Sequence, residues 1–263
     1  MLTRDDPDGP ILITQPAHAW MAGQMAAAWG NDLFGEVAPR DEVCLAAAQH
    51  DIGWVAWEGA PTLNGRTGRP YTFLELPTGD HVRIWSSAVP AVLAQSRYAA
   101  LLVSLHFSGL YARHNYARDT AEEAQAARAL VARQAAFEEQ MTEALRREGR
   151  YAAAVTPAAI ARNRRLVAVW DALSLALGMG LRGERTFERV PTADSETTLT
   201  LTPAEGGRIA VAPWPFAAGE VTLTVEGRRL TGTFADDEVM RTALRGAPWV
   251  TLEFHLADAS AKE

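Results

Sequence analysis

Residues 46–59, AAAQHDIGWVAWEG, place the imidazole of His50 beside the carboxylate of Asp51 at the end of an alanine-rich run. The apolar spacing predicts a helix from Arg40 to Asp51 whose inward face includes Val43 and His50. A buried face accepts two adjacent ionisable groups only when a partner compensates their charge. This stretch therefore predicts a functional site, and a metal ion is a partner that satisfies both groups.

Composition limits the class of protein. The 263 residues are 48% apolar, enough for a substantial core, and the net charge of -7 argues against a surface that binds nucleic acid through phosphate contacts. The single cysteine, Cys44, excludes an intrachain disulfide and a thiolate metal cluster, so histidines and carboxylates must supply any metal site.

The same features bear on location. No run approaches the roughly 18 apolar residues of a membrane span, and the start MLTRDDPDGP is acidic where a signal peptide is basic and then apolar. We therefore expect a cytoplasmic protein that acts on a small molecule and binds neither nucleic acid nor membrane. The sequence does not predict an oligomeric state.

Four of the six histidines fall on the inward faces of separate predicted helices. A lone inward histidine is ordinarily a hydrogen-bonded core residue, which is the alternative for each of them. Asp171 fits that alternative less well, because burying a carboxylate without a partner costs several kcal/mol and LVAVWDALSLALG (166–178) offers no cation nearby on the same face. One or two divalent ions (Fe, Mn or Zn) would satisfy the whole set. The predicted ligands are His18, His50, Asp51, His81, His106 and Asp171.

Two further regions complete the predicted organisation. Residues 53–79 are rich in Gly, Pro, Asn and Thr and suit an irregular loop over the site, where Trp54, Trp57 and Tyr71 would contact substrate or would only pack beneath the loop. Beyond about residue 185 the chain alternates β-branched and aromatic residues with Gly and Pro. We therefore expect a mainly α protein, a helical bundle over 1–184 with a smaller β-rich C-terminal region over 185–263, α+β overall.

The order of the ligands resembles that of the HD-domain superfamily of metal-dependent phosphohydrolases, in which HDIG is one form of the central motif. The wider text, HDIGWVAWEGAPTLNGRTGRPYTF (50–73) and ALLVSLHFSGLY (100–111), is similar to a bacterial family catalogued as a domain of unknown function. The resemblance implies an HD-like bundle in which His18, His50, Asp51 and Asp171 hold one ion. It also implies that Asp51 bridges to a second ion on His81 and His106, which makes these three the expected catalytic residues.

One position departs from that pattern. Many HD hydrolases carry a lysine three residues after the aspartate, where it can reach phosphate, and this chain has Trp54. Replacement cations are present at Arg113, His114 and Arg162 or Arg165, although solvated surface charge is the ordinary role of such residues.

Three functions remain open on this basis. The first is a metal-dependent phosphohydrolase, in which the ion lowers the pKa of a water and polarises a small-molecule phosphoester. The second is a di-iron oxygenase, which the same superfamily contains. The third is a scaffold that binds metal without turnover.

Overall fold

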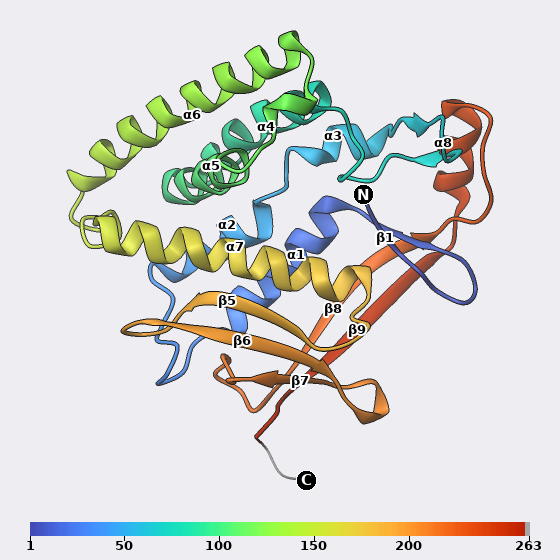
Figure 1. Cartoon of the computed structure of the whole chain (residues 1–263). Coiled ribbons are helices and arrows are strands. Elements are labelled where there is room, and N and C mark those ends of the chain that lie inside the picture. The colour runs from blue at the N-terminus through green and yellow to red at the C-terminus, as the bar shows by residue number, and fades with distance from the viewer. Residues whose placement is uncertain (261–263) are drawn as a thin grey trace.

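The computed structural model describes residues 1–260, and its centre is a curved seven-stranded sheet with helices stacked on one face (Figure 1). The strand order is β1-β2-β8-β9-β7-β6-β5, and neighbouring strands are antiparallel except for β7 and β9. A separate two-stranded ribbon pairs β3 with β4. The strands are β1 (Leu2–Arg4), β2 (Ile11–Ile13), β3 (Leu63–Asn64), β4 (Arg69–Pro70), β5 (Arg185–Pro191), β6 (Glu196–Pro203), β7 (Ile209–Ala212), β8 (Glu220–Arg229) and β9 (Trp249–Asp258).

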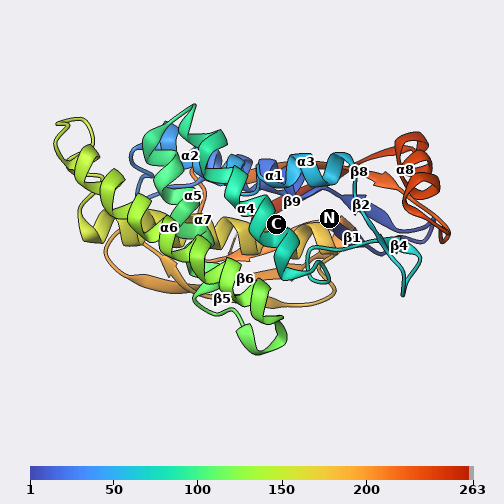
Figure 2. The same cartoon turned by 90° about the horizontal axis from the view of Figure 1, so that it is seen from above.

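The helices form successive layers above this sheet. The helices are α1 (Gln15–Ala28), α2 (Arg40–Gln49), α3 (Trp54–Gly59), α4 (Thr78–Leu93), α5 (Arg97–Tyr111), α6 (Ala121–Arg146), α7 (Pro157–Met179) and α8 (Asp237–Gly246), with short 3-10 turns at Tyr116–Arg118 and Glu205–Gly207. Helices α1 and α7 contact the sheet, α2 and α5 pack on them, and α4 and α6 lie farther out (Figures 1 and 2). None of the helices within 1–260 has the length and apolar run that crossing a bilayer requires.

Side-chain caps begin α1, α6 and α7, whereas α2 starts after Pro39 without one. The Thr14 side chain accepts from the Ala17 N–H at the start of α1, and Thr156 caps α7 immediately before Pro157. At the start of α6, Thr120 and Glu123 form the reciprocal capping box that the sequence predicts. These local signals place each helix start independently of tertiary packing.

The expected fold class, a mainly α HD-like bundle with a small β region, is wrong. The structure is an α+β fold in which a large sheet forms one entire layer. The three-residue strands β1 and β2 are too short to show an alternating pattern, and β2 is ordered by pairing with β8, more than 200 residues later. Helix α8 also interrupts the region that was expected to be β-rich.

One hydrophobic cluster joins the sheet and the helices. It includes Ile11 from β2, Leu102 from α5, Leu177 from α7 and Leu223 from β8, all fully buried. The N-terminal strands thus belong to the same sheet as the C-terminal strands. The division into units 1–184 and 185–263 stays a prediction, and its last three residues, 261–263, lie outside the described part of the chain.

The segment 53–79, expected as an irregular loop, contains α3 and the β3–β4 ribbon. The ribbon lies beside α8 at one end of the molecule (Figure 2), where the Leu63 N–H donates to Asp237. Gly53 begins this segment in a right-handed helical conformation, with φ of -59°. A Cβ at Gly53 would lie 2.3 Å from the carbonyl oxygen of Ile84, so glycine is required here by the close approach of α4.

Candidate metal centre

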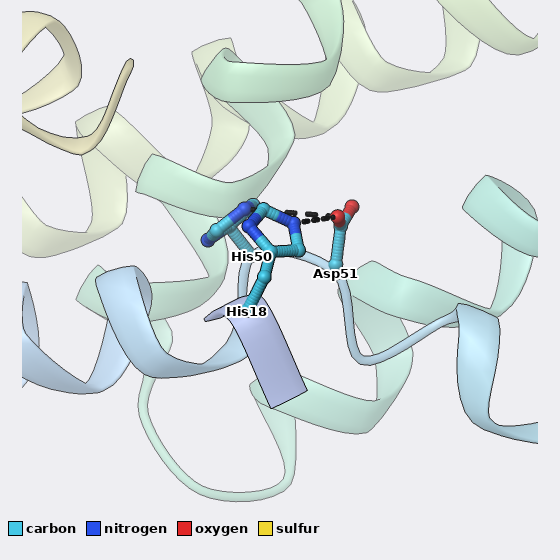
Figure 3. A group of neighbouring side chains, drawn as sticks. All are labelled: His18, His50 and Asp51. Atoms are coloured by element: carbon cyan, nitrogen blue, oxygen red, sulfur yellow. Dashed lines mark hydrogen bonds and ion pairs between the residues drawn. The ribbon is translucent and has the colours of Figure 1, made fainter. Parts of the chain in front are cut away.

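Five of the six predicted ligands converge between α1, α2, α5 and α7. The His18 Nε2 atom lies 2.9 Å from Asp51 Oδ2, and the His50 Nε2 atom lies 3.7 Å from the same oxygen (Figure 3). Asp171 approaches from α7, with Oδ1 3.4 Å from His50 Nε2 and Oδ2 3.6 Å from His106 Nε2. The structure therefore brings together residues that are up to 153 positions apart, from 18 to 171.

The tautomer of His18 follows from its hydrogen bonds. The Ser174 hydroxyl donates to the carbonyl of Asp171 at 2.9 Å, so its oxygen is left to accept from His18 Nδ1, also at 2.9 Å. The His18 Nδ1–H thus donates to Ser174, and Nε2, which faces Asp51 Oδ2 at 2.9 Å, is the ring atom that could bind an ion. Metal-binding histidines are commonly oriented in this way by a partner on the other ring nitrogen.

His50 repeats the arrangement. Its Nδ1 donates to the Ala47 carbonyl at 2.8 Å, so Nε2 is the ring atom that faces Asp51 and Asp171. Within residues 1–260 this buried Nε2 atom has no hydrogen-bond partner. An unpaired acceptor facing two carboxylates is repulsive unless a proton or a cation lies between them.

The pKa values of the site residues in the metal-free protein also show that the site favours a positive charge. Burial opposes a charge on His50, but the charges of Asp51 and Asp171 outweigh it and raise the pKa of the imidazole to about 9. Burial also raises the pKa of Asp171, yet the neighbouring His50 holds that pKa well below its usual range. The pKa of His106 is lowered to about 4, chiefly by burial, so His106 stays neutral. A proton on His50 thus occupies the position that a cation would take.

The donor atoms fit a divalent ion. Four contacts among His18 Nε2, His50 Nε2 and the two carboxylates span 2.9–4.0 Å. Ligands about 2.1 Å from one ion in tetrahedral geometry are about 3.4 Å from one another. Two neutral imidazoles and two carboxylates carry a net charge of -2, which a divalent ion neutralises. Within residues 1–260, two groups of side chains could hold an ion: one is His18, His50 and Asp51, and the other is His50, His106 and Asp171.

The sixth predicted ligand lies outside both groups. His81 is on α4, its Nε2 contacts the Phe73 carbonyl at 3.1 Å, and its ring packs edge-on against Trp54. Asp171 has one oxygen toward His50 and the other toward His106, and His50 is the residue that the two groups share.

Two cavities reach this centre. The first, of about 750 Å³, exposes Asp51, His106 and Asp171 to solvent between α4, α5 and the turn after α5. Of the predicted substrate-contacting residues, Trp54, Arg113 and His114 line it. Trp57 and Tyr71 instead pack in a cluster around Trp54. The second cavity, of about 850 Å³, lies between α5, α7 and β5 and shares His106 and Asp171 with the first.

Two contacts around the site were not predicted from the sequence. Ser174 lies one turn after Asp171 on α7, and its hydroxyl orients His18. His114 forms an ion pair with Asp119 at 2.7 Å, and Thr78 donates to the other oxygen of Asp119 at 2.8 Å. The five-residue spacing of His114 and Asp119 was the available signal.

Comparison with known proteins places the chain in a family. The family model described as "Protein of unknown function (DUF3891)" matches residues 1–232, so the chain belongs to this family. This agrees with the resemblance to a domain of unknown function noted from the sequence. No curated protein and no solved structure matches the chain.

Proposed function

We propose that this member of the DUF3891 family is a metal-dependent hydrolase that cleaves a phosphoester of a small molecule. One observation carries the proposal: the Nε2 atoms of His18 and His50 both face the carboxylates of Asp51 and Asp171, which line a cavity of about 750 Å³. In the metal-free protein a proton on His50 balances part of this negative charge. A divalent ion bound by the same atoms would balance all of it.

In this proposal, His18, His50, Asp51 and Asp171 hold the ion, and His106 contacts Asp171 from the cavity side. A bound divalent ion supplies Lewis acidity, lowering the pKa of a water and polarising the phosphoryl oxygen. Asp171, whose side chain is 14% exposed, is reachable from solvent, whereas His18 and His50 are fully buried. The buried histidines therefore bind and orient, and substrate approaches from the side of Asp171 and His106.

His114 is the candidate proton donor to the leaving group. Its Nε2 is paired with Asp119, which fixes the ring and leaves Nδ1 as the position for an exchangeable proton. Tyr111 stacks on the imidazole with ring centroids 5.0 Å apart, and both residues line the metal-facing cavity. Trp54 stands where many HD hydrolases have a phosphate-directed lysine. Here it supplies an apolar wall of the cavity.

The arrangement supports one ion more directly than two. A second ion of the kind expected from the resemblance needs His81, whose Nε2 contacts the Phe73 carbonyl. The di-iron oxygenase alternative depends on that second ion, so the hydrolase is the better supported function. The activity assay below distinguishes the hydrolase from a scaffold that binds metal without turnover.

The test combines metal analysis with an activity screen. The full chain, reconstituted with Mn²⁺, Zn²⁺ or Fe²⁺, is assayed against a panel of phosphoesters, and metal per chain is measured by mass spectrometry. Asp51→Ala is expected to lose both metal and activity, whereas the exposed Asp32→Ala control keeps both. Stoichiometric metal without hydrolysis of any phosphoester would refute the hydrolase and support the metal-binding scaffold. Metal retained by Asp51→Ala would show that the site is misassigned.

A further inference from the structure

The second cavity beside the metal centre is lined by arginines, although the chain as a whole carries a net charge of -7. It shares His106 and Asp171 with the metal-facing cavity, and Arg113 lines both. We call this second cavity the arginine groove. Its arginines are Arg113, Arg162, Arg164, Arg165 and Arg189.

Three of these arginines have structural partners. Arg162 donates to the Phe34 carbonyl at 2.8 Å, and Arg165 donates to the Arg189 carbonyl at 2.9 Å. Arg189 forms an ion pair with Glu196 at 3.0 Å. Their main role is to join α7 to the sheet and the loop after α1, so they do not by themselves indicate a ligand.

Arg113 and Arg164 differ from them. Within residues 1–260 the guanidinium group of neither residue has a hydrogen bond or an ion pair, and the backbone N–H of Arg113 donates to the Leu110 carbonyl. Arg164 is half-buried, and its guanidinium lies over α5 at Gly109, where an added Cβ would be 2.9 Å from the Nη2 atom. Glycine at this position leaves room for the guanidinium inside the groove.

Positive charge in the groove exceeds the negative charge that faces it. The carboxylates lining the groove are Asp171, which faces the histidines, Asp194, and Glu196, which is paired with Arg189. Burial lowers the pKa of Arg165, and the charges of Arg189 and Arg113 also lower it, against the opposite effect of Glu196. Like charges gathered on a partly buried surface are unfavourable unless an anion joins them.

We propose that the arginine groove binds a second phosphate group of the substrate, through Arg113 and Arg164, while the reacting phosphoester lies at the metal centre. The proposal rests on the proposed function for the reacting end of the substrate. A guanidinium donates two parallel hydrogen bonds to phosphate, which suits recognition of a group that is not cleaved. Because the two cavities meet at His106 and Asp171, one molecule can occupy both. The substrate class is therefore a small molecule that carries two separated phosphate groups.

The test begins with binding and does not depend on turnover. Inorganic phosphate is titrated calorimetrically into the full chain, as purified and after chelator treatment, for the unaltered protein, Arg113→Gln, Arg164→Gln and the control Arg133→Gln. Arg133 is an exposed arginine on α6, away from both cavities. We expect phosphate to bind the chelator-treated protein, and each groove variant to weaken binding about tenfold or more, with the control unchanged. Metal content should be the same in all four proteins.

A kinetic comparison then asks whether the groove serves the substrate. Arg164→Gln should raise KM for a bisphosphate ester and leave KM for a monophosphate ester unchanged, and free phosphate should compete with the bisphosphate. Activation by free phosphate would overturn the assignment to substrate and indicate a separate effector. Absence of phosphate binding, or equal binding by all four proteins, would overturn the groove. If no phosphoester is hydrolysed but the groove variants lose phosphate binding, the proposed hydrolase function is refuted and the arginine groove stands as an anion-binding site.

Discussion

Replacing Ser174 by alanine distinguishes between two interpretations of the histidine cluster: a metal site, or a cluster that is only buried. Ser174 is fully buried, and its oxygen accepts from His18 Nδ1 at 2.9 Å while its hydroxyl donates to the Asp171 carbonyl. In the metal-free variant, His18 can move its proton to Nε2 and donate to Asp51, which lies 2.9 Å away. In the metal-bound variant that shift is impossible, because Nε2 is occupied by the ion.

The magnitude follows from this asymmetry. Metal-bound Ser174→Ala keeps a buried Nδ1–H donor without a partner, at a cost of about 1–3 kcal/mol that the metal-free form largely avoids. Metal affinity should therefore fall roughly 10- to 100-fold, the usual effect of removing a hydrogen bond that orients a ligand. The assay is competition against a chelator of known affinity, with circular dichroism to check the fold.

Ser104→Ala is the matched control for this variant. Ser104 is equally buried, and its hydroxyl contacts Gln134 and Glu138, both at 2.8 Å, away from the site. It should lower thermal stability and leave metal affinity unchanged. If Ser174→Ala bound metal within twofold of the unaltered protein, His18 would not be an oriented ligand, and the reasoning from its tautomer would be refuted.

Two further predictions follow from the same geometry. Gly53→Ala should destabilise the fold by about 1–3 kcal/mol or more, because its Cβ would lie 2.3 Å from the Ile84 carbonyl oxygen. Gly59→Ala, with no atom within 4 Å of its Cβ, should not, and equal melting temperatures in the two variants would contradict this packing. Binding of Mn²⁺ should release a proton, because the pKa of His50 in the metal-free protein is raised from 6.5 to about 9 and only the neutral imidazole binds metal. Calorimetry should accordingly show affinity rising almost tenfold per pH unit well below pH 9 and levelling off above it, whereas a flat profile from pH 6.5 to 8.5 would exclude His50 as a ligand.

Local signals in the sequence predicted much of the helical layer and the site within it. The capping box at Thr120, the inward periodicity around His18 and His50, and the cost of burying Asp171 are properties of short segments, so they can be recognised without tertiary structure. They located five residues that the structure brings together.

The extent of the sheet and the place of the N-terminal strands in it were not predicted, because their cause is not local. Strands β1 and β2 have three residues each and gain their hydrogen bonds from β8 and from each other. The placement of His81 has a similar explanation: its helical phase is compatible with an inward position, but its ring contacts the Phe73 carbonyl. The groove partners Arg113 and Arg164 lie on different segments, and their convergence depends on the packing of α5 against α7.

The most direct test of the central claim is an anomalous difference map from a crystal of the full chain loaded with Mn²⁺ or Zn²⁺. The account predicts a peak about 2.0–2.3 Å from His18 Nε2, His50 Nε2 and at least one carboxylate oxygen of Asp51 or Asp171. No peak at these atoms in the metal-loaded crystal, or a peak bound by other residues, would contradict it.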